Sequence, residues 1–464
     1  MIAEVPAGWE MTPLSDLGRW TGGGTPSKAN PAFWVRKGIP WVSPKDMKRS
    51  LIEDAEDHIS KAAVAASTTN IVPNSSILVV TRSGILSHSL PVAKTLLPVA
   101  INQDLKALVA GKQYDPDFLL YAFRGYEESI LRECRKSGTT VANLDTDRLL
   151  AFVIPVPPLV EQHRIVAKLD QLFGKSSSAR EELAHIPRLV ERYKEAILAA
   201  ALRGDTTAAW RNAHPTAWSS LEREQAVPLT RKREGRSTGA ETAKRSLLPN
   251  SWKWARVESI GEVILGRQRS PENHEGPNLR PYVRAANITW EGWDLSDVKQ
   301  MNFDERDFKR FKLHPGDVLI NEGSGSADEV GKPAIWNGEI KNCCFQNTLI
   351  AVRPHATTSE YLYFVLLNAA LSKAFVDEAR GVNIHHIGRA GLAQFPIPVP
   401  PSEEQQEIVR RIKAAFKVID KVEEETSRAT QLLDRLDRAT LEKAFRGELV
   451  LSLQTASTVM ANSE

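Results

Sequence analysis

The sequence has few cysteines and no hydrophobic run long enough to cross a membrane. Its three cysteines, Cys134, Cys343 and Cys344, form no CxxC pair. Such a set gives no disulfide framework and suits a reducing compartment. The first residues show no charged-then-apolar signal, and no stretch reaches the roughly eighteen apolar residues of a membrane helix. We therefore expect a cytoplasmic protein.

The chain also lacks a strong excess of charge of either sign. It has 60 basic and 57 acidic residues and a formal net charge of +3. This weakly basic balance does not by itself predict nucleic-acid binding. A hydrophobic content of 42% and a charged content of 25% are typical of a globular protein, and 464 residues suffice for two or three domains.

Sequence motifs of common catalytic centres are absent as well. Asn30-Pro-Ala-Phe33 lacks the second proline of an adenine methyltransferase loop. The stretch from Gly325 to Lys332 has one residue too many for a P-loop, and Pro333 follows in place of Ser or Thr. His385-His386 are adjacent and have no nearby cysteine pair to complete a metal site. We predict a chain with no catalysis and no metal of its own.

What the sequence does contain is a duplicated proline motif. Ile154-Pro-Val-Pro-Pro158 precedes Glu161-Gln162, and Ile397-Pro-Val-Pro-Pro401 precedes Glu404-Gln405. The offset is 397 − 154 = 243 residues, more than half the chain, which indicates a tandem duplication.

A long heptad pattern follows each proline motif. Steps of four and three between mostly apolar residues predict two coiled-coil seams that pack against each other. Prolines precede each predicted helix, and Gly204 and Gly447 stand where the helices should stop. Pro187 should kink the first helix. The predicted seam positions are Ile165, Leu169, Leu172, Ser176, Ala179, Leu183, Ile186, Val190, Tyr193, Ile197 and Ala200, then Ile408, Ile412, Ala415, Ile419, Val422, Thr426, Ala429, Leu433 and Leu436.

The remaining sequence suggests two globular regions and a linker. Residues 1–153 and 247–395 repeat each other in outline, with Pro6-Ala-Gly-Trp9 matching Pro249-Asn-Ser-Trp252, but their loops differ. A duplicated enzyme would be expected to keep its reactive residues in both copies. Residues 205–246 contain Arg231-Lys-Arg233 among small polar residues and predict a basic, flexible linker. DNA phosphates are an alternative partner for this linker.

Two loop-rich globules on a rod suit a protein that reads two separated patches. Polar loops can contact base edges and phosphates, and a rod of about 65 Å is commensurate with one to two turns of B-DNA. A scaffold that binds only proteins would use the same architecture. The residues alone leave both functions open.

The motifs resemble the specificity subunits of type I restriction–modification systems, of the enterobacterial type. The resemblance rests on both Pro-Val-Pro-Pro and Glu-Gln motifs, and it spans nearly the whole chain. Further resembling stretches are Gly23-Gly-Thr-Pro-Ser27, Ile39-Pro-Trp-Val-Ser-Pro-Lys-Asp46, Gly316-Asp-Val-Leu-Ile320, Glu195-Ala-Ile-Leu198 through Trp210-Arg211, and Lys443-Ala-Phe-Arg-Gly-Glu-Leu449.

The resemblance implies an α/β (α+β) fold with two target recognition domains, separated by two long antiparallel coiled-coil helices in a pseudo-twofold repeat. It implies a non-catalytic subunit that reads a bipartite, asymmetric DNA target. Two modification subunits carrying S-adenosylmethionine would methylate adenines, and two restriction subunits would supply translocation and cleavage with ATP and Mg²⁺. The expected boundaries are 1–153 and 247–395 for the recognition domains, 154–204 and 396–450 for the helices, 205–246 for the linker and 451–464 for the tail.

Loop residues of both globules are the candidate DNA contacts. Arginine and asparagine can pair bidentately with guanine and adenine edges, which discriminates bases by about 1–3 kcal/mol. The candidates are Thr25, Ser27, Lys28, Lys45, Arg82, Lys136 and Thr139 in the first globule, and Arg267, Arg269, Arg284, Asn287, Asn383 and His385 in the second.

Overall fold

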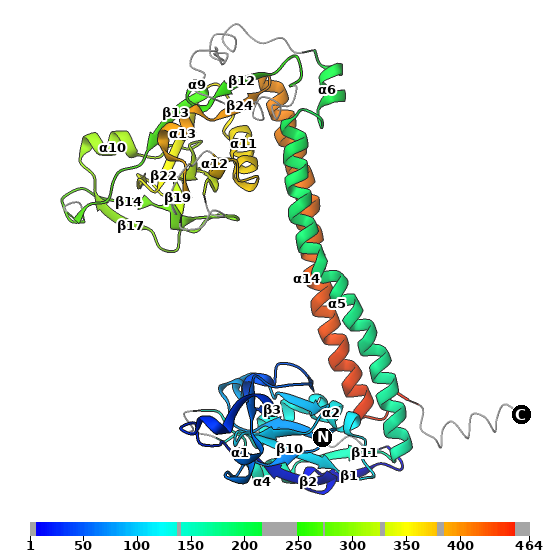
Figure 1. Cartoon of the computed structure of the whole chain (residues 1–464). Coiled ribbons are helices and arrows are strands. Elements are labelled where there is room, and N and C mark those ends of the chain that lie inside the picture. Colours follow the sequence, from blue (N-terminus) through cyan, green and yellow to red (C-terminus); the bar gives the residue numbers. More distant parts are fainter. Residues whose placement is uncertain are drawn as a thin grey trace, which may run out of the picture. The chain divides into compact units, whose positions relative to one another are not determined.

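The chain divides into two compact units, each of which contains part of both long helices. The computed structural model describes residues 6–136, 141–215, 248–271, 274–324, 330–377 and 385–450 (Figure 1). Unit 1 comprises Met1–Ala184 and Ser427–Glu464, and unit 2 comprises His185–Thr426. The tail 451–464 and most of the predicted linker lie outside the described residues. So do the candidates Thr139 and Asn383.

Unit 1 is built on two sheets and a separate strand pair. A five-stranded sheet has the order β2-β10-β7-β8-β4, a four-stranded sheet has the order β5-β3-β9-β6, and β1 pairs with β11. All four residues of β7 are buried, as its run of aliphatic residues predicts. Its strands are β1 (Glu10–Pro13), β2 (Gly18–Gly22), β3 (Trp34–Val42), β4 (Leu51–Ile52), β5 (Asp57–Ile59), β6 (Ile71–Val72), β7 (Ile77–Val80), β8 (Val92–Thr95), β9 (Val99–Ile101), β10 (Leu105–Ala110) and β11 (Val153–Val156). Its short helices are η1 (Leu14–Leu17), η2 (Pro31–Phe33), η3 (Pro44–Asp46), α1 (Lys61–Ala65), η4 (Gly84–Ser87), α2 (Pro116–Gly125), α3 (Glu127–Cys134) and α4 (Thr146–Ala151).

Unit 2 repeats this topology. Its sheets β13-β22-β18-β20 and β17-β14-β21 and its pair β12-β24 have the same neighbours as their counterparts in unit 1. The predicted internal repeat is therefore confirmed at the level of strand order. The strands are β12 (Lys253–Arg256), β13 (Gly261–Leu265), β14 (Leu279–Val283), β15 (Ile288–Thr289), β16 (Gly292–Trp293), β17 (Lys299–Asn302), β18 (Val318–Asn321), β19 (Gly323–Ser324), β20 (Pro333–Ile335), β21 (Cys344–Phe345), β22 (Leu349–Pro354), β23 (His385–His386) and β24 (Pro396–Val399). The short helices are α6 (Ala208–Ala213), α9 (Val257–Ile260), η6 (Ala285–Asn287), α10 (Glu305–Phe311), α11 (Ser359–Leu371), α12 (Ala374–Asp377) and α13 (Gly388–Gln394).

The two long helices, α5 (Leu159–Leu202) and α14 (Ser402–Phe445), run antiparallel. In unit 1, Ser176 of α5 donates a hydrogen bond of 2.8 Å to Asp437 near the end of α14. In unit 2, Lys194 late in α5 forms an ion pair of 3.1 Å with Glu423 earlier in α14. Residue numbers rise along one helix as they fall along the other, which confirms the predicted pairing.

The predicted seam fails at three positions. Tyr193, Val422 and Leu436 are 61%, 43% and 56% exposed. A straight α-helix has 3.6 residues per turn, so a strict 3.5-residue pattern drifts away from the contact line over several heptads. Beyond Val190 the buried residues of α5 are Leu198, Ala201 and Leu202 instead. Helix α5 nevertheless continues through Pro187.

Both long helices end at the predicted glycines, and each end closes on a proline–tryptophan segment. Gly204 and Gly447 have φ of 81° and 73°, values that favour glycine. A Cβ atom would lie 2.7 Å from Pro249 at Gly204 and 2.5 Å from Pro6 at Gly447. The repeated Pro-x-x-Trp motif is therefore the surface on which each helix stops.

The glutamine of each Glu-Gln motif joins the globule to the helix. Gln162, 1% exposed, donates to the carbonyls of Pro157 (2.9 Å) and Gln113 (3.1 Å) and accepts from the amide of Asp115 (2.8 Å). Gln405 repeats two of these bonds, to Pro400 and from Thr358. Each glutamine satisfies backbone groups at the start of the long helix and at the N-terminus of a neighbouring helix, α2 or α11.

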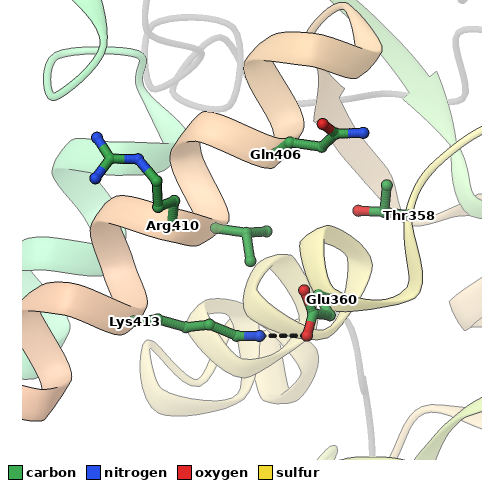
Figure 2. A pocket seen from close by; sticks show the side chains of 6 residues that line it. Thr358, Glu360, Gln406, Arg410 and Lys413 are labelled. Atoms are coloured by element: carbon green, nitrogen blue, oxygen red, sulfur yellow. Dashed lines mark hydrogen bonds and ion pairs between the residues drawn. The ribbon is translucent and has the colours of Figure 1, made fainter.

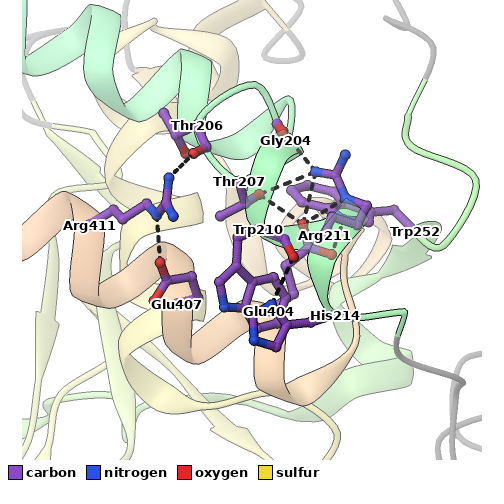
Figure 3. Close-up of polar contacts among 10 residues, drawn as sticks. All are labelled: Gly204, Thr206, Thr207, Trp210, Arg211, His214, Trp252, Glu404, Glu407 and Arg411. Atoms are coloured by element: carbon purple, nitrogen blue, oxygen red, sulfur yellow. Dashed lines mark hydrogen bonds and ion pairs between the residues drawn. The ribbon is translucent and has the colours of Figure 1, made fainter.

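The glutamate of the second motif anchors the segment after α5. The fully buried Glu404 accepts hydrogen bonds from Thr207 (2.8 Å), Arg211 (2.8 Å) and Trp252 (2.9 Å) (Figure 3). This carboxylate thereby fixes helix α6, which the sequence assigned to the flexible linker. The linker prediction is wrong for residues 208–213, because a buried charge requires these partners.

Replacing Gln162 with alanine removes three hydrogen bonds and leaves buried backbone groups unpaired. We expect the free energy of unfolding of unit 1 to fall by about 2–4 kcal/mol. Chemical denaturation followed by circular dichroism measures this loss. The control Gln171→Ala, on the exposed face of α5, should change stability by less than about 0.5 kcal/mol. Equal losses of stability for both substitutions would contradict the conclusion that the hydrogen bonds of Gln162 stabilise the junction of globule and helix.

Candidate nucleic-acid interface

One edge of unit 1 gathers the loops that carry the candidate residues. Strands β2 and β7 end opposite the start of β10, where Gly22 pairs with Lys106 and Val80 with Leu105. Strands β3 and β9 run parallel, so their carboxyl ends meet at one edge. We call the loops at these strand ends rim 1. Rim 1 comprises residues 23–28, 43–46, 81–83, 102–104, 136 and 141–144.

Backbone hydrogen bonds tie the loops of rim 1 together. The Gly24 amide donates to Ile101 (3.0 Å), and the Arg82 amide donates to Asp104 (3.3 Å). The Leu144 amide donates to Thr81 (2.8 Å), and the Lys136 amide donates to Asn143 (2.9 Å). The Asn102 amide donates to Val42 (3.0 Å), just before residues 43–46. The loops therefore form one connected rim from five distant parts of the sequence.

The glycine-rich loop is held close to the sheet. A Cβ atom at Gly23 would lie 1.9 Å from the carbonyl oxygen of Ile101, so only glycine fits. The indoles of Trp41 and Trp34 donate to the carbonyls of Gly24 (3.0 Å) and Ser27 (3.2 Å). With its backbone fixed in this way, the loop exposes the side chains of Thr25, Ser27 and Lys28.

The candidates of rim 1 differ in how free their side chains are. Arg82 and Lys28 are exposed, and no described side chain pairs with either charge. Lys45 forms ion pairs with Glu56 (2.6 Å) and Asp57 (2.9 Å), which raise its pKa. Lys136 lies 3.9 Å from Asp145. Arg82 and Lys28 are thus the cations best placed to meet a phosphate.

The structure adds Gln103 to this group. Its exposed amide accepts a hydrogen bond from the hydroxyl of Thr25, and the adjacent Asp104 carbonyl binds the amide of Arg82. A glutamine amide can pair with an adenine edge. The polar turn Asn102-Gln103-Asp104 between two strands was the sequence signal for it.

Unit 2 has an equivalent edge, which we call rim 2. Strands β13 and β18 end where β22 begins, and β14 and β21 run parallel to the same edge. Rim 2 comprises residues 266–269, 284–287, 322–323, 346–348 and 385–386. As at Gly23, a Cβ atom at Gly266 would meet a backbone carbonyl, that of Gln346, at 2.2 Å.

The candidates of rim 2 form more ion pairs and hydrogen bonds within their own unit than those of rim 1 do. Arg267 pairs with Asp307 (2.7 Å), and Arg284 pairs with Asp297 (2.8 Å). Asn287 is 2% exposed, and its amide group bonds only to backbone atoms of residues 284, 294 and 297. Arg269 is exposed and donates to His274 (3.0 Å). Of these four candidates, Arg269 is thus the side chain best placed to contact DNA. Asn287 instead holds the conformation of the loop.

His385 reaches rim 2 through its backbone. In strand β23, His385 pairs with Ser324 and His386 with Gly323. The amide of Ile387 donates to Glu322, at the end of β18. The structure therefore brings His385, Arg267 and Arg284 to one edge although they are far apart in the sequence.

The described residues offer little for catalysis. Burial raises the pKa of the Cys343 and Cys344 thiols to about 12 and that of Cys134 to about 11, so these thiols are not nucleophiles at neutral pH. Among the described residues, no group of three His, Cys, Asp or Glu side chains could hold a metal ion. In that part of the chain, no helix combines the length and apolar character of a membrane span.

A small cavity beside Gln405 is also lined by polar side chains, but its cations are paired with carboxylates. It has a volume of about 290 Å³ and lies between α11 and α14 (Figure 2). Its cations are Arg410, paired with Glu407 at 2.7 Å, and Lys413, paired with Glu360. The two arginines beside Glu407 lower the pKa of its carboxyl to about 2. This cavity therefore presents no unpaired cation to a phosphate.

Each of the two repeats matches the model of a known protein family. A model of the type I restriction modification DNA specificity domain matches residues 6–188 and again residues 249–430. The chain belongs to this family. The predicted identity as a specificity subunit of a type I restriction–modification system is confirmed, and the scaffold alternative is not favoured.

Named relatives are specificity subunits of type I restriction enzymes. The EcoR124I/EcoR124II subunit of Escherichia coli is 41% identical over 182 residues, 39% of this chain and 44% of that subunit. The EcoBI subunit of Escherichia coli is 25% identical over 380 residues, 79% of this chain and 73% of its own. The MjaIX subunit of Methanocaldococcus jannaschii is 28% identical over 460 residues, 97% of this chain and 95% of its own.

Solved structures show the same fold. A chain from work on complex assembly and conformational transition of the type I system aligns with a TM-score of 0.66 at 21% identity, covering 96% of this chain and 99% of its own. The HsdS subunit from Thermoanaerobacter tengcongensis aligns with a TM-score of 0.56 at 20% identity, covering 96% and 98%. The predicted fold class is therefore confirmed.

Removing one free cation of rim 1 should weaken DNA binding in a salt-dependent way. For Arg82→Ala, we expect the slope of log affinity against log salt to fall by about 0.9, the value for one lost phosphate contact. Titrations of duplex DNA at several salt concentrations measure it. The control Lys112→Ala removes an exposed cation just past the other end of β10 and should leave the slope unchanged. A larger change in slope for Lys112→Ala than for Arg82→Ala would place the DNA interface on another part of the surface.

Proposed function

We propose that the two rims read the two halves of a bipartite, asymmetric DNA target. The observation that carries this proposal is the repeated edge of strand ends, which has one backbone architecture and two different sets of side chains. Rim 1 presents Thr25, Gln103 and Arg82, whereas rim 2 presents Arg269 with Arg267 and Arg284. Equal scaffolds with unequal side chains suit two half-sites of different sequence.

The remaining candidates belong to the same proposal with a positioning role. Lysines such as Lys28, Lys45 and Lys136 would contact phosphates, and Thr139, Asn383 and His385 would extend the loops toward bases. Phosphate contacts fix the register of a protein on the duplex, and base contacts select its sequence. The long helices, each of 44 residues, would set the spacer between half-sites.

Specificity subunits act within a complex, and we propose that this one binds two identical modification subunits. The exposed apolar residues of the long helices support this stoichiometry. Leu189 and Tyr193 of α5 are 57% and 61% exposed, and Leu432 and Leu436 of α14 are 61% and 56% exposed. The two pairs are related by the repeat offset of 243 residues. A surface that occurs twice suits two copies of one partner.

The partners would supply the chemistry in the cytoplasm. The modification subunits would hold S-adenosylmethionine, and two restriction subunits would hold ATP and Mg²⁺. This chain would contribute recognition of double-stranded DNA and no cofactor of its own.

Exchange of one globule should change one half of the methylated motif. The chain and its modification subunits are expressed in a methylation-free host, and the modified bases are sequenced. We expect a split motif with one methyladenine per strand. Exchange of residues 1–153 for those of a related subunit should alter one half only. Unsplit or chain-independent methylation would refute the proposed function.

Disruption of one apolar pair should remove one modification subunit. For Leu189→Asp with Tyr193→Asp, native mass spectrometry should show a complex with one modification subunit in place of two. Adding Leu432→Asp and Leu436→Asp should abolish binding. The conservative control Leu189→Met with Tyr193→Phe keeps the apolar surface and should retain two subunits. Full binding by the fourfold variant would exclude this surface.

A further inference from the structure

Unit 2 contains an acidic groove lined with aromatic rings. Its cavity of about 770 Å³ lies between α5, α11, α14 and the turn between β15 and β16. Five carboxylates line it, together with two ammonium groups. Lys194 is already shared by Glu423 (3.1 Å) and Asp420 (3.8 Å). The carboxylates are those of Glu191, Glu195, Glu291, Asp420 and Glu423, and the rings are those of Trp290, Tyr363 and Phe416.

The matching region of unit 1 contains its own guanidinium. Arg124 of α2 lies over the rings of Phe173 (5.6 Å) and Tyr121 (5.8 Å). Two further arginines form ion pairs close by, Arg180 with Asp434 and Asp437, and Arg438 with Glu128. In this region of unit 1, an arginine of the same unit therefore already lies over the aromatic rings, and arginines of the same unit pair with the carboxylates.

Unit 2 keeps the aromatic rings and loses the arginines. At the offset of 243 residues, Phe416 stands for Phe173 and Phe364 for Tyr121, with ring centroids 6.0 Å apart. Leu367 replaces Arg124, and Glu423 replaces Arg180. Glu195 occupies the position that Arg438 holds in the other copy. A site that holds a guanidinium in one copy thus lacks it in the other, where five carboxylates outnumber two ammonium groups.

We propose that this groove binds the chain's own basic segment, Arg231-Lys232-Arg233. Arginine favours an aromatic face flanked by carboxylates, because it stacks on the ring while its donors bind the acids. The segment supplies three consecutive cations from the linker, which lies outside the described residues.

The attachment points of the segment place the groove within reach. Its flanks are fixed at Glu404, which binds Arg211 before the linker and Trp252 after it. Along α14, Phe416 is about 18 Å from Glu404 at 1.5 Å per residue. The extended chain from Pro215 to Arg231 spans about 50 Å. Attachment to the same chain also gives the segment a high effective concentration at the groove.

Zero-length crosslinking of the intact chain tests the proposal. A carbodiimide joins the Lys232 ammonium to a carboxylate that touches it, and mass spectrometry identifies the pair. We expect Lys232 to couple mainly to Glu191, Glu195 or Glu291. Glu403 is the internal control, since it is exposed and lies beside the fixed flanks of the linker. Predominant coupling to Glu403, or even coupling to all exposed acids, would overturn the proposal.

Two variants make the result specific. Arg231→Ser with Arg233→Ser keeps Lys232 and changes no residue of the described fold, and it should lower coupling to the groove at least fivefold. Leu367→Arg restores the unit 1 arrangement and should displace the segment to a similar extent, with circular dichroism to verify folding. Unchanged coupling in the double-serine variant would show that the arginines do not hold the segment. Coupling of the groove only to lysines of an added modification subunit would assign it to that partner and likewise refute the proposal.

Discussion

The architecture depends on burying one polar side chain at each junction of globule and helix. Gln162 and Gln405 are almost completely buried, and each bonds to backbone groups of the proline motif and of the globular segment that precedes it. An unpaired buried amide is costly, so these bonds hold only when strand, helix and globule meet in one geometry. The junction thereby fixes where each long helix begins relative to its own globule.

The need to satisfy buried polar groups also explains why some features are shared by the two copies and others differ. The strand order, the glycine stops and the glutamine clamps are shared, because each satisfies backbone groups or a close approach that another residue would disrupt. The exposed side chains of the rims, such as Arg82 and Arg269, face solvent, where a changed side chain costs little stability. No described side chain of unit 1 pairs with Arg82 or Lys28, whereas unit 2 pairs Arg267 and Arg284 with aspartates. The two rims therefore differ in the side chains that they present, although their strand order is shared.

Cations and carboxylates are grouped in different regions of unit 2. The cations of rim 2 follow strand ends, and the carboxylates of the groove lie on the long helices and in the turn between β15 and β16. Net charge hides this division, because 60 basic and 57 acidic residues nearly cancel. A weakly basic composition is therefore compatible with a DNA-reading edge, provided that the acidic surface lies elsewhere or is covered by basic segments.

The sequence by itself determined the duplication, the two long helices, their glycine stops and the family, since these rest on local patterns that recur at a fixed offset. It also located the loops of both rims. Only tertiary structure decided which loops share an edge, because hydrogen bonds between distant strands join Arg82 to Asp104 and Gly24 to Ile101. Only it showed that Asn287 is buried, that Gln103 is exposed and that Tyr193 leaves the seam. Heptad spacing predicts a helix face from a strict period, whereas the real face follows 3.6 residues per turn and the neighbours that cover it.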